Sequence, residues 1–417
     1  MPAENARWIE LRVALKRFLE AHIYPAEPVL HGADRVLSEQ CVRELAKLAQ
    51  QQGLWALGHP KAIGGGGMPF IEYVYLNEII GRSEYAQRVF GTYSLQDSLM
   101  LHQYASDEQR ERYLNPLVAG EICPSFAMTE PDVASSDPTQ LQTRADLDKG
   151  EWTIQGRKWF TTGADIAAYT TVMCRTEPDA APHKAFSMIL VPTDNPGYRI
   201  VRDTPVLGIG GGHFEVAYED LRVPENHLLG VRGEGFLIAQ RRLGPGRIFH
   251  CMRWLGQAQR AFDLMCRRLH EREAFGSSLT EKQLMQQHVF DSQAEIQSCR
   301  QMTLHAAKQI DKGDLARIEI GSIKVMGARM LHNVIDRAIQ VYGAAGLTDD
   351  TPLSRMYRHA REARIYDGPD EVHIQSVARQ LLKRYADQGP GYDFAEADSD
   401  ADIAGADARC KREIGTL

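Results

Sequence analysis

The sequence predicts an α+β fold with an N-terminal helical domain, a middle antiparallel β domain and a C-terminal helical bundle. Apolar residues recur at helical spacing at both ends of the chain, whereas short runs rich in Thr, Val, Tyr and Ile occupy the middle. Strands and helices do not alternate, and no G-x-G-x-x-G follows a strand, which argues against a Rossmann fold. We place the three parts at residues 1–125, 126–235 and 236–387, followed by an acidic tail at 388–417.

The first part is predicted to be helical. Its apolar residues near the N-terminus recur at helical spacing: Trp8, Ile9, Leu11, Leu15, Phe18 and Leu19. Similar patterns predict helices over residues 40–52, 70–83 and 107–118. The run IGGGGM at residues 63–68 interrupts them. No Lys-Ser/Thr pair follows these glycines, so a flexible turn is favoured over a phosphate-binding loop.

The middle part contains four strand-like runs, at residues 152–160, 169–175, 185–192 and 216–223. Gly, Pro and Asp turns separate these runs, which is typical of a small antiparallel β domain. A second glycine cluster, at residues 208–212, lies between two of the strands and predicts a loop.

The last part returns to helical spacing from about residue 236 to residue 387 and resembles a bundle. One apolar stripe runs through Ile320, Ile323, Met326, Met330, Val334, Ile335 and Ile339. The tail from Gln388 onward is acidic, rich in Gly and Ala and poor in large apolar residues. That composition predicts disorder.

The composition fits an ordinary soluble globular protein. The 417 residues are 43% hydrophobic and 25% charged, and the net charge is −7 with basic residues scattered along the chain. Neither nucleic acid nor an anionic membrane surface is therefore an expected partner. Seven dispersed cysteines without a C-x-x-C pair predict reduced thiols in a cytoplasmic protein. No run of about 18 apolar residues predicts a membrane span.

Four motifs carry a resemblance to a known family. They are FAMTEPDVASSD at residues 126–137, KWFTTG at 158–163, REAFG at 272–276 with Gln283 after it, and QVYGAAG at 340–346 with IYDGPDEVH at 365–373. In this order and at these separations they resemble the acyl-CoA dehydrogenase family, over about residues 5–387. The DGPDEVH form is similar to one branch of that family, which includes the dehydrogenase part of proteins that also carry a kinase-like domain.

The resemblance implies FAD-dependent α,β-dehydrogenation of an acyl-CoA thioester to the 2-enoyl-CoA. In the family a base takes the α-proton, flavin N5 takes the β-hydride, and the backbone N–H of the base helps to stabilise the enolate. The base implied here is Asp367, where many members have Glu. Gly246 occupies the alternative base position of some members and cannot act as one. Read without the resemblance, Asp367 caps a helix that begins near Pro369.

The resemblance also implies FAD contacts. Those around the flavin ring and pyrophosphate are Phe126, Met128, Thr129, Ser135, Ser136, Trp159 and Thr161. Which of the two serines fills the family role is open, and Trp159 is alternatively a β-domain core residue. Contacts to the FAD of a neighbouring subunit are Arg272, Phe275, Leu279 and Gln283, and a helix-ending turn contributes Gln340, Gly343 and Gly346. Alternatively, Arg272 forms a surface ion pair with Glu271 or Glu273.

The implied substrate contacts are Ser136, Arg247, Tyr366 and Gly368. Arg247 either binds CoA or pairs structurally. Gly244 stands where members often have an acidic residue that contacts the CoA adenosine. His373 and His213 are ambiguous, and for His373 a helical surface or core position is favoured over a catalytic one.

The implied partners are an acyl-CoA substrate, an electron-transferring flavoprotein as electron acceptor, and further copies of the chain in a dimer or tetramer that acts in fatty acid metabolism. No metal is expected. Two alternatives remain. One is an acyl-CoA oxidase or related flavin enzyme of the same fold, and the other is a flavin-free acyl-CoA-binding protein.

Overall fold

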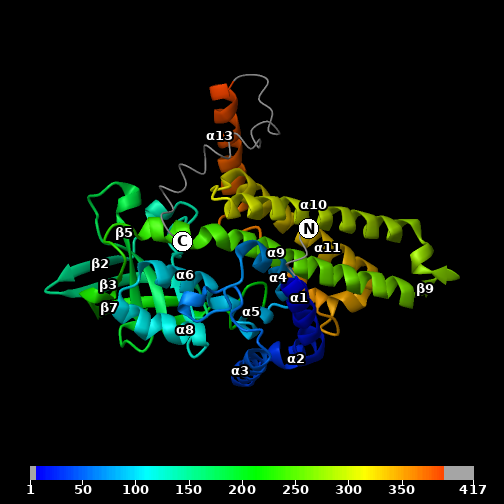
Figure 1. The fold of residues 1–417 in the computed structure, drawn as a ribbon, viewed down its shortest axis with the longest axis horizontal. Coiled ribbons are helices and arrows are strands. Elements are labelled where there is room, and N and C mark those ends of the chain that lie inside the picture. The colour runs from blue at the N-terminus through cyan, green and yellow to red at the C-terminus, as the bar shows by residue number, and fades with distance from the viewer. Residues whose placement is uncertain (1–5, 389–417) are drawn as a thin grey trace. The chain divides into compact units, whose positions relative to one another are not determined.

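The computed structural model describes residues 6–388 (Figure 1). The tail predicted to be disordered therefore lies outside the described residues, except for Gln388, which ends a helix. The described residues form two compact units. The helical unit runs up to Ala21, over Pro69–Ala86 and from Pro245 onward, and the β unit comprises His22–Met68 and Gln87–Gly244.

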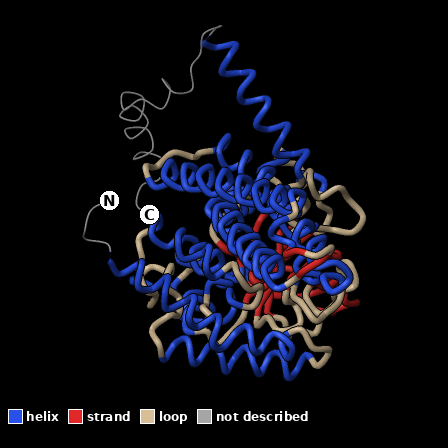
Figure 2. Tube along the Cα trace, turned by 90° about the vertical axis from the view of Figure 1, so that its right-hand side faces the viewer, coloured by secondary structure: helices blue, strands red, loops and turns tan. Residues whose placement is uncertain are grey.

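The helical unit is built on long helices. They are α1 (Ala6–Phe18), α4 (Phe70–Ile80), α9 (Gly235–Glu271, which starts in the β unit), α10 (Gln283–Asp311), α11 (Arg317–Tyr342), α12 (Leu353–Glu362) and α13 (Asp370–Gln388). Short 3-10 turns, η8 (Leu279–Glu281) and η9 (Gly343–Leu347), and a hairpin of β9 (Glu273–Ala274) and β10 (Ser277–Ser278) connect them. Helix α11 packs against α10, α12 and α13, and α13 projects beyond the other helices of this unit (Figures 1 and 2).

The β unit combines short helices with one mixed sheet, whose strands are red in Figure 2. The helical elements are η1 (Leu19–Ile23), α2 (Tyr24–Leu30), α3 (Arg35–Gln51), η2 (Lys61–Ile63), α5 (Ala86–Val89), η3 (Thr92–Ser94), α6 (Leu95–Tyr104), α7 (Asp107–Gln109), η4 (Arg110–Leu114), α8 (Asn115–Ala119), η5 (Pro138–Gln140), η6 (Pro182–Lys184) and η7 (Glu225–His227). The strands are β1 (Pro124–Ala127), β2 (Arg144–Asp148), β3 (Glu151–Thr162), β4 (Tyr169–Arg175), β5 (Phe186–Pro192), β6 (Tyr198–Asp203), β7 (His213–Pro224) and β8 (Leu228–Leu229).

The sheet is mainly antiparallel, as predicted. Its order is β6-β7-β3-β2-β4-β5-β8, and β1 pairs with β4. The β1–β4 pairing and one bridge between β2 and β4 are parallel. The four predicted strands correspond to β3, β4, β5 and β7, and residues 208–212 form the predicted loop between β6 and β7.

The helix predictions agree with α1, α3, α4 and the run from α7 to α8, whereas α2, α5 and α6 are additional. The glycine-rich run at 63–68 forms a turn after η2. The apolar stripe on α11 is largely buried, but the side chain of Met326 is 46% exposed, so the stripe is interrupted there. Among the described helices, none is both long and apolar enough to cross a membrane.

Candidate functional site

A β-bulge in β3 redirects the motif at residues 158–163. Lys158 pairs with Val216 and Thr161 pairs with Phe214, so β3 has one residue more than β7 between these two pairs. Phe160 takes a left-handed φ of 49°. The N–H of Trp159 donates to the carbonyl of Thr129 at 3.0 Å instead of to β7. The bulge therefore ties β3 to the loop after β1, as bulges near functional sites often do.

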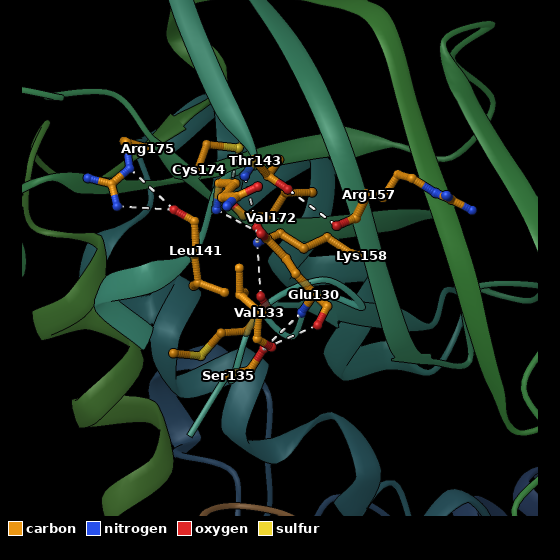
Figure 3. A network of polar contacts seen from close by, with 12 residues as sticks. Glu130, Val133, Ser135, Leu141, Thr143, Arg157, Lys158, Val172, Cys174 and Arg175 are labelled. Carbon is orange, nitrogen blue, oxygen red and sulfur yellow. Dashed lines mark hydrogen bonds and ion pairs between the residues drawn. The ribbon is translucent and has the colours of Figure 1, made fainter. Parts of the chain in front are cut away.

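A buried ion pair holds this loop against the strand (Figure 3). The ammonium of Lys158 donates to Glu130 Oε1 at 2.7 Å and to the carbonyl of Met128 at 2.9 Å. Glu130 also accepts from the backbone N–H groups of Gln142, at 2.7 Å, and Thr143, at 2.9 Å. Burial lowers the pKa of Lys158 although Glu130 opposes that shift. Burial would raise the pKa of Glu130, but Lys158 and the two N–H groups hold it below its usual value.

The two serines of the first motif differ in their surroundings. Ser135 Oγ accepts from the Glu130 N–H at 3.0 Å, so this hydroxyl shapes the turn. Ser136 is exposed. The ring of Phe126 contacts a cation, with the guanidinium carbon of Arg242 lying 4.3 Å from the ring centroid. Because the Ser135 hydroxyl is engaged in the turn, Ser136 is the serine whose side chain is available to a ligand.

Two polar atoms of the second motif fit the expected flavin. The hydroxyl of Thr161 and the indole N–H of Trp159 are buried and have no hydrogen-bond partner among the described residues. Buried polar groups are normally hydrogen-bonded, so a bound polar group is the usual reason for such atoms. A flavin ring carries several acceptors and an N–H that suit them. Trp159 is partly buried, so the core-residue alternative does not fully describe it.

In the helical unit, Asp367 lies in a strained turn between α12 and α13. Its φ is 53°, and that of Gly368 is 99°. A Cβ added at Gly368 would lie 2.7 Å from Nε2 of His373, so only glycine fits there. A non-glycine residue in the left-handed region is costly and is often found at functional sites. The turn therefore needs contacts that hold it in place.

Three basic side chains hold the carbonyls of this turn. His373 Nε2 lies 3.1 Å from the carbonyl of Asp367, and Arg247 Nε donates to the same oxygen at 3.3 Å. The ammonium of Lys324, whose side chain is fully buried, donates to the carbonyl of Ala363 at 2.7 Å and to that of Gly368 at 3.3 Å. His373 is only 7% exposed, which confirms the interpretation of this histidine as a core residue.

The carboxylate of Asp367 faces His250 on α9. Oδ2 lies 3.1 Å from His250 Nε2, and Nδ1 of the same ring accepts from Arg253 at 2.9 Å. The helix-cap alternative does not account for this contact with α9. Helix α13 instead begins with Asp370, whose buried carboxylate accepts from Arg364 at 2.9 Å.

Tyr366, an expected substrate contact, packs inside this cluster. Its hydroxyl accepts from the indole N–H of Trp254 at 2.7 Å, and its ring centroid lies 5.2 Å from that of His250. Burial raises the pKa of Tyr366 far above the usual range. The hydroxyl is therefore neutral, and it orients the ring beside His250.

The third motif forms the hairpin of β9 and β10. Phe275 and Gly276 make its two-residue turn with φ values of 53° and 77°, as a type I′ turn requires. Phe275 is fully exposed, and the Leu279 N–H donates to the carbonyl of Arg272 at 2.9 Å. Among the described residues, the side chain of Arg272 makes no ion pair with Glu271 or Glu273, which disfavours the ion-pair alternative. Gln283 is exposed at the start of α10.

The turn at residues 340–346 ends α11, as expected. Gln340 and Gly343 are exposed, and Gly343 has a φ of 64°. Gly346 is buried, and a Cβ there would approach Ile339 and Tyr342 at 3.0 Å. Gly346 is therefore required by packing within the unit. At Gly343, by contrast, an added Cβ would have no atom within 4 Å, so the backbone there is exposed and accessible to a ligand.

Comparisons with known proteins identify the family of the chain. Models of the N-terminal, middle and C-terminal domains of acyl-CoA dehydrogenases match residues 8–121, 125–221 and 233–382. The chain belongs to the acyl-CoA dehydrogenase family. That family is FAD-dependent, so this member is an oxidoreductase with FAD as its cofactor.

The relatives span the chain almost completely. "Probable acyl-CoA dehydrogenase FadE2" of Mycobacterium tuberculosis is 43% identical over 402 residues, which are 92% of this chain and 97% of that protein. Acyl-CoA dehydrogenase family member 11 of Rattus norvegicus is 38% identical over 93% of this chain, which spans only 52% of that protein. A solved structure of a family member from Mycobacterium abscessus has a TM-score of 0.87 at 38% identity and covers 92% of this chain and 100% of its own.

Sequence reasoning missed His250, Arg253 and Lys324. A signal for the first two was present, because Arg247, His250 and Arg253 follow one another at a spacing of three along α9 and so share a helix face. Lys324 lies in an apolar stretch of α11, where a lone lysine is easily taken for a side chain that reaches solvent.

Proposed function

We propose that this protein oxidises an acyl-CoA thioester to the 2-enoyl-CoA, with Asp367 as the base that removes the α-proton. The observation that carries the proposal is the Asp367 turn, a strained backbone segment whose carbonyls are held by three basic side chains and whose carboxylate faces His250. Backbone strain that the surroundings over-determine is characteristic of functional sites.

The residues of the chain have separate roles in this proposal. Asp367 accepts the α-proton, and its own backbone N–H stabilises the negative charge that develops on the thioester oxygen. When bound, FAD would supply the acceptor for the β-hydride. The β unit contributes the flavin contacts Thr129, Ser136, Trp159 and Thr161. Two residues of the helical unit, Tyr366 and Gly368, border the acyl group.

For Arg247, two roles were open: binding CoA and pairing structurally. Its Nε donates to the carbonyl of Asp367 at 3.3 Å, and burial lowers its pKa while Asp367 opposes that shift. This favours a role in holding the turn over a role in gripping CoA.

The experiment that tests the proposal is anaerobic flavin bleaching by a panel of acyl-CoAs. Asp367→Asn is nearly isosteric, so we expect it to keep FAD and substrate but to bleach about 10⁴-fold more slowly, the upper end of general-base contributions. Asp349→Asn, a change at a carboxylate that is 94% exposed, is the matched control. A rate for Asp367→Asn within tenfold of the unmodified protein would assign the base to another residue.

We further propose that the electrons pass to an electron-transferring flavoprotein and that the substrate is a fatty acyl-CoA. The chain is proposed to form a dimer or tetramer in the cytoplasm. Large apolar side chains on α13 support the assembly, because Leu382 is 71% exposed and Tyr385 is 49% exposed. Peroxide formation in air by the substrate-reduced enzyme would instead favour an oxidase.

A further inference from the structure

His250 links the carboxylate of Asp367 to a buried cation. The imidazole lies between Oδ2 of Asp367, 3.1 Å from its Nε2, and the guanidinium of Arg253, 2.9 Å from its Nδ1. Arg253 is buried, at 9% exposed, and Asp367 Oδ2 and His250 are each partly buried. The contact therefore lies in a region where hydrogen bonds are stronger than in water.

The direction of both hydrogen bonds follows from the chemistry of arginine. A guanidinium has only donors, so Nδ1 of His250 must be an acceptor without a proton. In neutral imidazole the other nitrogen then carries the proton, and Nε2–H donates to the carboxylate of Asp367. A doubly protonated ring would place an Nδ1–H against the N–H of Arg253, which the geometry disfavours.

We propose that His250 is a positioning residue, whose Nε2–H holds the Asp367 carboxylate, in a tautomer that Arg253 fixes. The inference rests on the proposed function, because it assigns His250 a role only if Asp367 is the base. His250 takes no proton during the reaction. It fixes one carboxylate oxygen, so that the short aspartate side chain is held in a single orientation.

The electrostatic surroundings keep His250 neutral. Burial and Arg253 lower its pKa, while Asp367 raises it and Lys324 lowers it. The charged or titratable groups that act on the ring or pack against it are Arg253 on α9, Lys324 on α11, and Tyr366 and Asp367 on the turn before α13. Cationic neighbours outnumber the single carboxylate, so protonation of the ring is unfavourable throughout neutral pH.

Two amide substitutions separate the two halves of this contact. Gln places its amide nitrogen near the position of Nε2, so His250→Gln keeps a donor for Asp367. Asn places its amide near the position of Nδ1, so His250→Asn keeps an acceptor for Arg253 and loses the donor. His250→Phe loses both. His305→Gln, on the exposed side of α10, is the matched control.

The measured quantities are the anaerobic bleaching rate of the FAD-loaded protein, its pH profile, the dissociation constant of a non-oxidisable acyl-CoA analogue, and FAD content. We expect His250→Gln to bleach within about tenfold of the unmodified protein, and His250→Asn and His250→Phe to bleach about a hundredfold more slowly, the effect of a misplaced catalytic group. Loss of the donor also disfavours the ionised carboxylate, so the acid limb of the profile moves to higher pH in the Asn and Phe variants only. Analogue affinity and FAD content stay unchanged.

A second readout does not depend on activity. In ¹⁵N-histidine-labelled protein, the His250 signals, identified by their absence in His250→Gln, should be those of the neutral Nε2–H tautomer from pH 8 to pH 6. A charged ring or the Nδ1–H tautomer would overturn the proposal whatever the activities of the variants. A Gln variant as slow as the Phe variant, or a Phe variant as fast as the unmodified protein, would also overturn it. Asp367→Asn is measured in the same experiment. An active Asp367→Asn variant refutes the proposed function itself. If Asp367→Asn is inactive but His250→Phe bleaches at the unmodified rate, only the role of His250 is refuted.

Discussion

Lys158 Nζ lies 2.7 Å from Oε1 of Glu130, and the two side chains are 0% and 5% exposed. This pair joins the bulge in β3 to the loop after β1, where Thr129 accepts from Trp159. A buried ion pair is weak evidence for stability by itself, but the loss of one partner leaves a buried charge uncompensated. The pair therefore fixes the shape of the loop after β1, which we propose contacts the flavin.

The first prediction concerns this pair. Glu130→Gln should destabilise the β unit by about 3–5 kcal/mol, because Lys158 remains buried without its carboxylate. The matched control is Glu219→Gln, since Glu219 forms an exposed pair with Arg199 and solvent screens such pairs, so that they contribute little to stability. Thermal unfolding and FAD content of the purified variants are the measurements. An unchanged melting temperature for Glu130→Gln would mean that Lys158 is not charged in the folded protein.

The second prediction is the pH dependence of the same pair. The folded-state pKa of Glu130 is below its ordinary value of 4.5. A depressed carboxylate pKa contributes stability that is present above the unfolded value and is lost as pH falls through the folded value. Melting temperatures should therefore fall below pH 4.5 more steeply in the unmodified protein than in Glu130→Gln. Parallel curves for the two proteins would contradict the lowered pKa.

The third prediction concerns Gly368. Alanine there must adopt a φ of 99° and meet Nε2 of His373 at 2.7 Å, so Gly368→Ala should displace the turn that carries Asp367. We expect a destabilisation of about 1–3 kcal/mol and slower flavin bleaching. Gly150→Ala is the matched control, because Gly150 also has positive φ but its added Cβ has no atom within 4 Å. If His373 is the obstacle, Gly368→Ala should cost less in a His373→Ala background.

The strands that the sequence predicted correctly are those with a buried face. β4 and β5 are almost entirely buried, and their Val, Ile and Met residues indicate this directly. β6 was missed because none of its side chains is buried and its apolar residues do not alternate with polar ones. The pairing of β1 beside β4 could not be predicted either, because parallel pairing of four residues depends on the rest of the sheet.

The candidate site divides in a similar way. The proposed roles of Asp367, Trp159 and Thr161 follow from the sequence, because local motifs mark these residues. The residues that hold them in place, Lys324, His250 and Glu130, could not be predicted from the sequence, because their contacts depend on how helices and strands pack. A histidine on an apolar helix is ordinary in sequence, and only the three-residue spacing from Arg247 to Arg253 set His250 apart.

The last prediction concerns the hairpin and the oligomer. Arg272 is exposed and Phe275 is fully exposed at the tip of a rigid type I′ turn, so neither contributes packing within its own unit. Arg272→Ala should therefore lower FAD affinity about tenfold or more, by removing a charged phosphate partner, without lowering the melting temperature of the FAD-free protein. Val36→Ser, at an exposed apolar residue of α3, is the control for a surface change.

Mixed oligomers decide whether this arginine serves a neighbouring subunit. Arg272→Ala subunits hold FAD weakly and Asp367→Asn subunits lack the base, so at an FAD concentration below the dissociation constant of the Arg272→Ala variant each variant alone should bleach little flavin per subunit. If the contact crosses between subunits, co-expression restores activity, because an Arg272→Ala subunit keeps its own Asp367 and receives Arg272 from its Asp367→Asn partner. If the contact lies within one chain, no subunit of the mixture has both groups at one flavin, and the co-expressed protein stays as inactive as the separate variants. Anaerobic flavin bleaching per subunit in the co-purified mixture, at the same limiting FAD concentration, distinguishes the two arrangements.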